Sequence, residues 1–262
     1  EQAAAEVTRL REGARAGEQH VRALTGLGAG LPIPEADVVD RPGWIRSAVG
    51  GIAALLDDVP GPRPAEGVVG GAVGRVTRSA AGVQMGALLA FLGSRVLGQY
   101  DPFGGPGGGS EAEPGDPSER TGRLLLVAPN VVAARQSLGV DAEDFALWVC
   151  LHEATHRLQF TAVPWLRDHL ADEVGRFLSI GDGQRGTLLE RLPEVLQAIR
   201  GSGVDSLTIV ELLQGPEQRA VLDRLLALTT LLEGHADHVM DAAGPDVVPS
   251  VETIHARFTL RR

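Results

Sequence analysis

The amino-acid sequence predicts a mainly α-helical protein with one small β element. Hydrophobic residues make up 44% of the chain and charged residues 22%, as in ordinary globular proteins. From Asp141 to the C-terminus almost every segment is rich in helix formers with interspersed apolar residues. Only one short apolar run, "RLLLVAPNV" at residues 123–131, has the character of a strand.

The length of the chain suits one large domain. With 262 residues the protein can bury a substantial core, and we expect a single domain over residues 1–262. We expect residues 1–75 to be its N-terminal helical part. Residues 103–118 are dense in Gly, Pro and Ser and predict a flexible surface loop, either a connector or a lid.

Two helices are expected near the N-terminus. Residues 3–25 carry helix formers, and "GLGAGLP" then ends the helix. This glycine pattern follows a helix rather than joining a strand to one, so it indicates a turn and not a nucleotide-binding loop. Asp40 and Pro42 have the order of an N-cap and an early proline, and they predict a helix over residues 43–59.

The middle of the chain supplies the predicted strand. The uncharged run at residues 79–94 predicts a buried core helix. After the flexible loop, the strand is expected near residues 124–127, closed by Pro129 and Asn130.

The C-terminal half is expected to be helical throughout. Asp141 can cap the first of its helices, where Glu143 and Asp144 complement the positive end of the helix dipole. The predicted helices cover residues 141–161, 163–179, 184–200, 207–213 and 217–242, and a last one begins near residue 249.

Composition excludes several classes of function. A net charge of −10 without a block of clustered arginines disfavours binding to nucleic acid. All 24 basic residues are arginines, which excludes a Walker A loop and Schiff-base chemistry. Cys150 is the single cysteine, so neither an intrachain disulfide nor a thiolate-rich zinc site can form.

We expect a cytoplasmic protein without a membrane partner. The single cysteine suits a reducing compartment, and the N-terminal residues lack the pattern of a secretory signal. The longest uncharged run, residues 79–94, is shorter than the roughly 20 apolar residues that a membrane-spanning helix needs.

The stretch "LWVCLHEATHRLQF", residues 147–160, contains the motif HExxH. His152 and His156 lie about 40° apart around a helix, one turn above the other, so both can reach one ion. Glu153 lies about 100° from His152, close enough to touch a metal-bound water. Two imidazoles that hold Zn²⁺ and a carboxylate that accepts a proton form the chemistry of a zinc hydrolase. The alternative is a pair of histidines that are hydrogen-bonded within the core.

A catalytic zinc needs a third protein ligand. Metzincins have a glycine three residues and a histidine six residues after the second motif histidine, but here Gln159 and Ala162 stand there, which excludes that class. Glu233, in "TTLLEGHADHVMD" at residues 229–241, is the best candidate.

Asp237 follows Glu233 by four residues, so both lie on one face of the expected helix. In that arrangement Glu233 can bind the metal while Asp237 orients a histidine ligand. His235 lies about 200° from Glu233, and as a ligand it would turn both carboxylates away. The alternative is a solvated acidic helix face.

Two further side chains are candidates for contacts with substrate. Tyr100, the single tyrosine, can donate a hydrogen bond to a developing oxyanion. The alternative, which the sequence favours, is a partly buried tyrosine that ends a helix. His235 is the second candidate, despite its angular position.

The combination of "HEATH" with Glu233 and Asp237 resembles the gluzincin pattern of thermolysin-like metallopeptidases. That resemblance implies that the helix glutamate is the third ligand and that the aspartate supports a histidine. The chain is also similar, from about residue 80 onward, to a family of zincin-like hydrolases from high-G+C bacteria that carry a deazaflavin-coenzyme-biosynthesis label. The segments with this similarity are "FLGSRVLGQYD", "LLLVAPNV", "DFALWVCLHEATHRLQFTAVPWLRDHL", "LLEGHADHVMD" and "VVPSVETIHARF". The similarity implies a mostly helical zinc-dependent metalloprotease whose strand at residues 124–127 borders the active-site cleft, as zincin sheets do. It implies no particular substrate.

We therefore expect a zinc-dependent hydrolase that binds one Zn²⁺ and cleaves amide bonds, most simply in peptides. Its ligands would be His152, His156 and Glu233, with Glu153 as the general base. One alternative is a metal-dependent amidase that acts on a small molecule. Another is a helical scaffold whose zinc is structural or vestigial.

Overall fold

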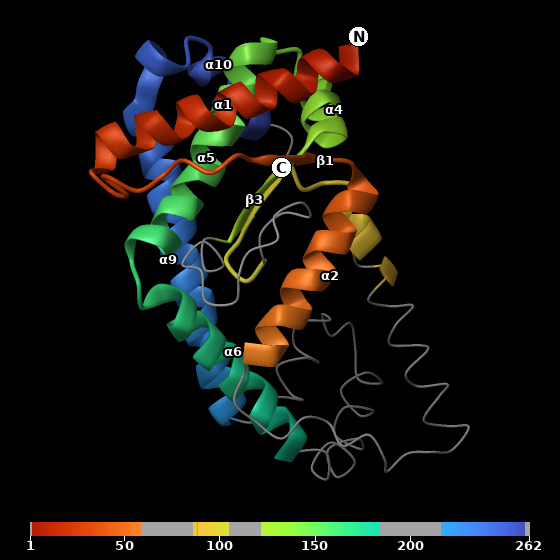
Figure 1. Ribbon diagram of the computed structural model, residues 1–262, viewed down its shortest axis with the longest axis vertical. Helices are drawn as coiled ribbons and strands as arrows, with labels where there is room; N and C mark the ends of the chain where they lie inside the picture. Colours follow the sequence, from red (N-terminus) through yellow and green to blue (C-terminus); the bar gives the residue numbers. More distant parts are fainter. Residues whose placement is uncertain (1, 59–85, 88, 105–121, 184–215, 260–262) are drawn as a thin grey trace, which may run out of the picture.

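The computed structural model describes residues 2–58, 86–87, 89–104, 122–183 and 216–259 (Figure 1). These residues form a mainly helical fold with a small three-stranded sheet, which confirms the predicted fold class. In the ranges that the structure covers, no helix is long and apolar enough to cross a membrane. The helices are α1 (Gln2–Thr25), α2 (Arg41–Asp58), α4 (Ala128–Leu138), α5 (Ala142–Ala162), α6 (Leu166–Gly183), α9 (Pro216–Val247) and α10 (Val251–Thr259), and the strands are β1 (Asp37–Val39), β2 (Gly98–Asp101) and β3 (Arg123–Val127).

The sheet has the order β1-β3-β2, with β1 parallel and β2 antiparallel to β3. β3 is the predicted strand, and its residues 124–127 are almost completely buried. No residue of β3 lies in the lining of the cavity beside the HExxH motif of α5, whereas Leu97, directly before β2, does, so the prediction that this strand borders the cleft is wrong. β1 and β2 were not predicted, since strands of three and four residues that include Asp37, Gln99 and Asp101 show no apolar alternation.

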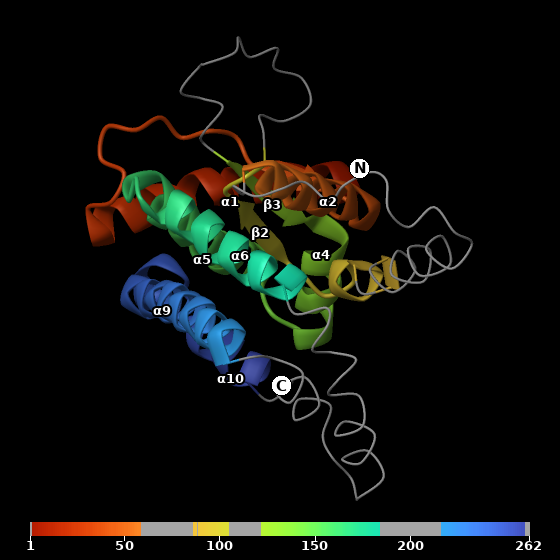
Figure 2. The same ribbon diagram turned by 90° about the horizontal axis from the view of Figure 1, so that it is seen from below.

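Helix α5 occupies the centre of the fold, between α1 and α9 (Figure 2). Its apolar residues join those of α1, α9 and α10 in the main core, in which Phe145, Leu151 and Ile254 are fully buried. α1 approaches α5 closely because Gly17 lies against the backbone of Cys150. A larger residue at position 17 would push the two helices apart.

A buried ion pair also joins α1 to α5. Glu18 is completely inaccessible to solvent, and one of its oxygens accepts a hydrogen bond from Arg157 at 2.7 Å. Arg157 also donates to the carbonyl of Pro34, and Arg22 donates to the other oxygen of Glu18. The buried charges therefore have several partners, as burial of ions in a protein requires.

The N-terminal helices agree with the sequence, whereas α4 was not predicted. Asp40 caps α2, because its carboxylate accepts a hydrogen bond from the backbone N–H of Gly43 at 2.7 Å. α4 begins directly after β3, with Pro129 in its first turn. Pro129 was interpreted only as the end of the strand. Proline is also favoured in the first turn of a helix, and α4 was not predicted because this second meaning was not considered.

The expectation of a buried helix over residues 79–94 is wrong for the described part. Residues 86–87 and 89–93 are helical, but Phe91 is 56% exposed and only Leu89 and Gly93 are buried there. The apolar composition of this segment does not show which side of the helix packs against the rest of the protein and which side faces solvent. The expected helices over 184–200 and 207–213 and most of the 103–118 loop lie outside the described residues.

The remaining C-terminal helices lie close to their predicted positions. α5 begins as expected, with Asp141 accepting hydrogen bonds from the backbone N–H groups of Glu143 and Asp144. α6 begins three residues later than predicted. α9 continues past residue 242 with a kink at Gly244, whose φ of 61° is in the left-handed region that glycine tolerates.

Candidate metal centre

The two histidines of the HExxH motif lie on one face of α5. The Nε2 atoms of His152 and His156 are 3.1 Å apart, and their rings are nearly perpendicular. Both side chains are half-buried, whereas most of the helix around them is fully buried. The spacing of four residues therefore places both imidazoles at one point, as the sequence predicts.

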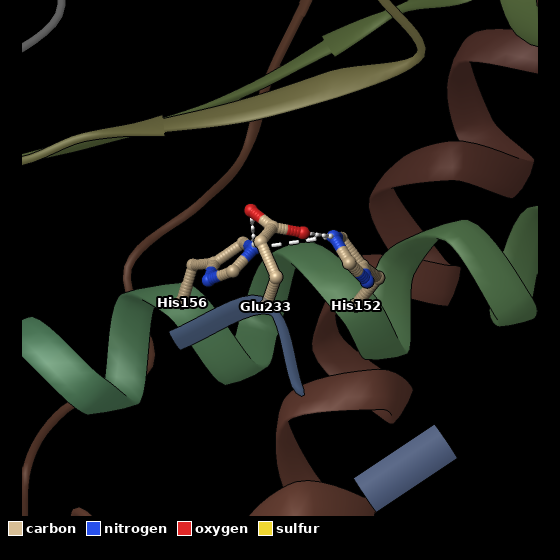
Figure 3. A group of neighbouring side chains, drawn as sticks. All are labelled: His152, His156 and Glu233. Atoms are coloured by element: carbon tan, nitrogen blue, oxygen red, sulfur yellow. Dashed lines mark hydrogen bonds and ion pairs between the residues drawn. The ribbon is translucent and has the colours of Figure 1, made fainter. Parts of the chain in front are cut away.

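Glu233 reaches the same point from α9, although it follows His156 by 77 residues. Its carboxylate oxygens lie 3.3 Å from Nε2 of His152 and 3.4 Å from Nε2 of His156. Figure 3 shows the carboxylate of Glu233 beside both imidazoles, with the three side chains converging from the two helices. The structure thus brings together the three residues that were predicted to bind the metal.

The spacing of these atoms suits a zinc ion. In a tetrahedral site with bonds of about 2.0–2.1 Å, ligand atoms lie about 3.3 Å from one another. The two nitrogens are 3.1 Å apart, and they lie 3.3 and 3.4 Å from different oxygens of the Glu233 carboxylate, so these spacings are close to that value. Two imidazoles and one carboxylate also form a donor set that zinc hydrolases use. The residues present therefore fit a zinc ion.

A cavity of about 600 Å³ lies against the site and leaves room for water and substrate. His152, Glu153 and Glu233 face it, and Asp237 is also part of its wall. The sequence did not indicate the rest of the lining, because its members are far apart in the chain. These residues are Leu97, Trp148, Val149, Met240, Asp241, His255 and Phe258.

Glu153 is a buried carboxyl group in the wall of this cavity, and it is only 7% exposed. Burial, and to a smaller extent the negative charge of Glu233, raises the pKa of Glu153 to about 8. The backbone of β2 covers it closely: a Cβ atom on Gly98 would lie 2.6 Å from the Cγ of Glu153. A carboxyl group with a raised pKa can both accept and return a proton near neutral pH.

The environment of His152 favours its neutral form. Burial, together with the neighbouring His156, holds the pKa of His152 below its ordinary value. Glu233 and Asp237 oppose this shift. A neutral imidazole is the form that binds a metal, so the site is prepared for that role.

The outer nitrogens of the two imidazoles do not contact Asp237, contrary to the role predicted for it. The Nδ1 atom of His156 is 2.9 Å from the side-chain oxygen of Gln159, and the Nδ1 atom of His152 is 3.3 Å from the sulfur of Met240. Asp237 is exposed and lines the cavity instead. The spacing of three residues between His156 and Gln159 was the signal that could have indicated this contact.

Tyr100 and His235 lie outside the lining of the cavity in the described structure. Tyr100 belongs to β2 rather than to a helix end, and its ring packs against Phe160. Burial raises the pKa of Tyr100 above its ordinary value. His235 points to Gln159, whose amide nitrogen lies 2.9 Å from the Nδ1 atom of His235. Neither residue joins the metal group.

Comparisons with known proteins agree with this geometry. The profile of a family described as zincin-like metallopeptidases matches residues 1–262. The fold is similar to a crystal structure described as "a putative hydrolase with a novel fold" from Chloroflexus aurantiacus, with 28% sequence identity and a TM-score of 0.58. The similarity covers 97% of this chain and 66% of that one, so the present chain spans just under two thirds of that protein. A search of curated proteins found no match. The chain therefore belongs to the family of zincin-like metallopeptidases.

Proposed function

We propose that this protein is a zinc-dependent hydrolase that cleaves amide bonds, most simply peptide bonds. His152, His156 and Glu233 would hold one Zn²⁺. The observation that supports this best is the convergence of two imidazole nitrogens, 3.1 Å apart, with the two carboxylate oxygens of Glu233, one 3.3 Å and the other 3.4 Å from them. They lie beside an open cavity whose wall also contains a buried glutamate. Membership of the zincin-like metallopeptidase family supports the same reaction class.

The chain's own residues provide the remaining chemistry. When bound, Zn²⁺ would polarise the substrate carbonyl and lower the pKa of the attacking water. Glu153 then accepts a proton from that water as its oxygen bonds to the carbonyl carbon. The same carboxyl group returns the proton to the departing nitrogen as the C–N bond breaks. The burial of Glu153 supports this double role, because its pKa of about 8 is close to neutral pH.

The size of the cavity keeps a second substrate class open. A volume of about 600 Å³ lies in the range of pockets for small ligands. Trp148 and Phe258 provide an aromatic wall that suits a compact amide as well as one side chain of a peptide. A small-molecule amidase would use the same zinc ligands and the same base.

The test combines metal analysis with turnover. We expect the purified protein to bind one zinc per chain and to hydrolyse members of a library of peptides and small amides. Glu153→Gln should keep the zinc and reduce kcat by about 10²–10⁴-fold, the usual contribution of a general base. His152→Ala and Glu233→Ala should lose the zinc.

His169→Ala is the matched control, because His169 is exposed and its ring contacts Trp165 rather than the metal group. This variant should retain both zinc and activity. Full activity of Glu153→Gln would remove the role assigned to the base. Stoichiometric zinc without any turnover would instead favour the scaffold alternative.

A further inference from the structure

Gln159 makes an unusual set of contacts for one buried side chain. It lies three residues after His156 on α5 and is 5% exposed. Its oxygen is 2.9 Å from the Nδ1 atom of His156. Its nitrogen is 2.9 Å from the carbonyl oxygen of Leu232 and 2.9 Å from the Nδ1 atom of His235, both on α9. Both hydrogens of the amide nitrogen and one lone pair of the oxygen are therefore in use.

These partners determine which way the amide points. The carbonyl of Leu232 can only accept a hydrogen bond, so the atom of Gln159 that faces it must be the nitrogen. The oxygen of Gln159 therefore faces His156 and accepts the hydrogen on its Nδ1. This leaves the lone pair of the His156 Nε2 atom free on the side of the metal group. One amide thus selects the tautomer that can bind zinc.

The same amide also holds the segment of α9 that carries Glu233. Leu232 and His235, which both contact Gln159, flank Glu233 within one turn of that helix. A change in this contact would shift the carboxylate relative to the imidazoles of α5. Among the described residues, the Nδ1 atom of His152 has no comparable partner, because it faces the thioether of Met240, which is a weak acceptor.

We propose that Gln159 is a positioning residue. Its single amide group orients the imidazole of His156 and also fixes the position of the turn of α9 that carries Glu233. This inference rests on the metal centre proposed above, but it concerns the precision with which the ligands are held. Loss of such a support in other zinc proteins lowers metal affinity about 10–100-fold.

Zinc affinity, measured by competition with a chelator, is the main test. Gln159→Met removes every polar contact at similar volume, and we expect its Kd for zinc to rise about 10–100-fold. Gln159→Glu keeps an acceptor for His156 but cannot donate to Leu232. We expect it to recover part of the affinity, so that its Kd lies between those of the wild type and Gln159→Met.

Gln99 provides the control, because it accepts a tertiary hydrogen bond from the indole N–H of Trp44 at 2.8 Å and is absent from the lining of the metal cavity. Gln99→Met should lower thermal stability without a change in the Kd for zinc. An unchanged Kd in Gln159→Met would overturn the proposal.

Nitrogen NMR of the metal-free wild type gives a second test that does not depend on the variants folding. It should show His156 with hydrogen on Nδ1 and with Nε2 unprotonated. The opposite tautomer would overturn the role of Gln159. If instead the wild type binds no zinc while His156 has the expected tautomer, the proposed function fails and the orienting contact stands.

Discussion

At the scale of single residues, Glu153 combines burial with a position beside the metal group. The folded protein raises the pKa of its carboxyl group to about 8, chiefly by removing it from water. In the unfolded chain the group returns to its ordinary value. The folded state therefore binds this proton more tightly than the unfolded state does, and the stability of the metal-free protein depends on pH.

The sign of this dependence follows from the raised pKa. The stabilisation is complete below the unfolded pKa and is lost as pH rises through about 8. Between the two pKa values the change is about 1.4 kcal/mol per pH unit. We expect the free energy of unfolding of the metal-free protein, measured with urea, to fall by about 1 kcal/mol from pH 7 to pH 9 through this group.

Glu153→Gln has no titrating group at this position, so the decrease due to Glu153 should disappear in that variant. The comparison of the two proteins removes the contributions of other groups, including His152. An identical dependence on pH in both proteins would show that Glu153 does not bind the extra proton.

At the scale of elements, the site depends on how closely α1 and α9 hold α5. Gly17 is a point of close α1 contact: a Cβ atom there would lie 3.0–3.1 Å from backbone atoms of Cys150 and Leu151. Backbone atoms inside a helix cannot move aside individually. The contact therefore requires glycine in spite of its low helix propensity.

Gly17→Ala should separate the two helices. Overpacking costs about 1–3 kcal/mol, and the gain in helix propensity offsets up to about 1 kcal/mol. We expect a net loss of about 1–2 kcal/mol in the free energy of unfolding by urea denaturation. Gly50→Ala in α2 is the control, because a Cβ atom at Gly50 would meet no other atom within 4 Å, and it should be neutral or stabilising. A Gly17→Ala variant as stable as the wild type would contradict the close contact.

The elements also show where sequence patterns are informative. α5 has a capping aspartate, acidic residues in its first turn and a long helical run, all of which are local signals. β1 and β2 have none, since three or four residues become a strand only through pairing with β3. α4 shows that one proline, Pro129, can both end a strand and stand in the first turn of the following helix.

At the scale of the whole molecule, a bound zinc would link two helices whose ligands are 77 residues apart in sequence, from His156 to Glu233. Any ligand that binds only the folded state stabilises it according to its affinity and concentration. At a free zinc concentration about 1,000 times Kd this amounts to about 4 kcal/mol. The proposed metal centre is therefore also a clamp between α5 and α9.

Removal of zinc by a chelator should accordingly lower Tm by roughly 10 °C in a calorimetric scan, given the usual relation between stability and Tm for a chain of this size. Glu233→Ala lacks one ligand, so its Tm should respond little to zinc or chelator. Equal Tm values for the wild type with and without zinc would contradict the clamp.

The sequence by itself determined the mainly helical fold, the capped helix α5 and the placement of His152, Glu153 and His156 along it. Each of these follows from spacing and capping within a few turns, where the backbone alone sets the geometry. The spacing of Glu233 and Asp237 also put both carboxylates in the wall of one cavity.

Only the tertiary structure decided what faces those groups. It places Gln159 and Met240, rather than Asp237, at the outer nitrogens of the histidines, and it buries Tyr100 in β2 away from the cavity. These contacts join segments far apart in the chain. Their geometry depends on how whole helices pack to bury apolar surface, and no local spacing encodes that arrangement.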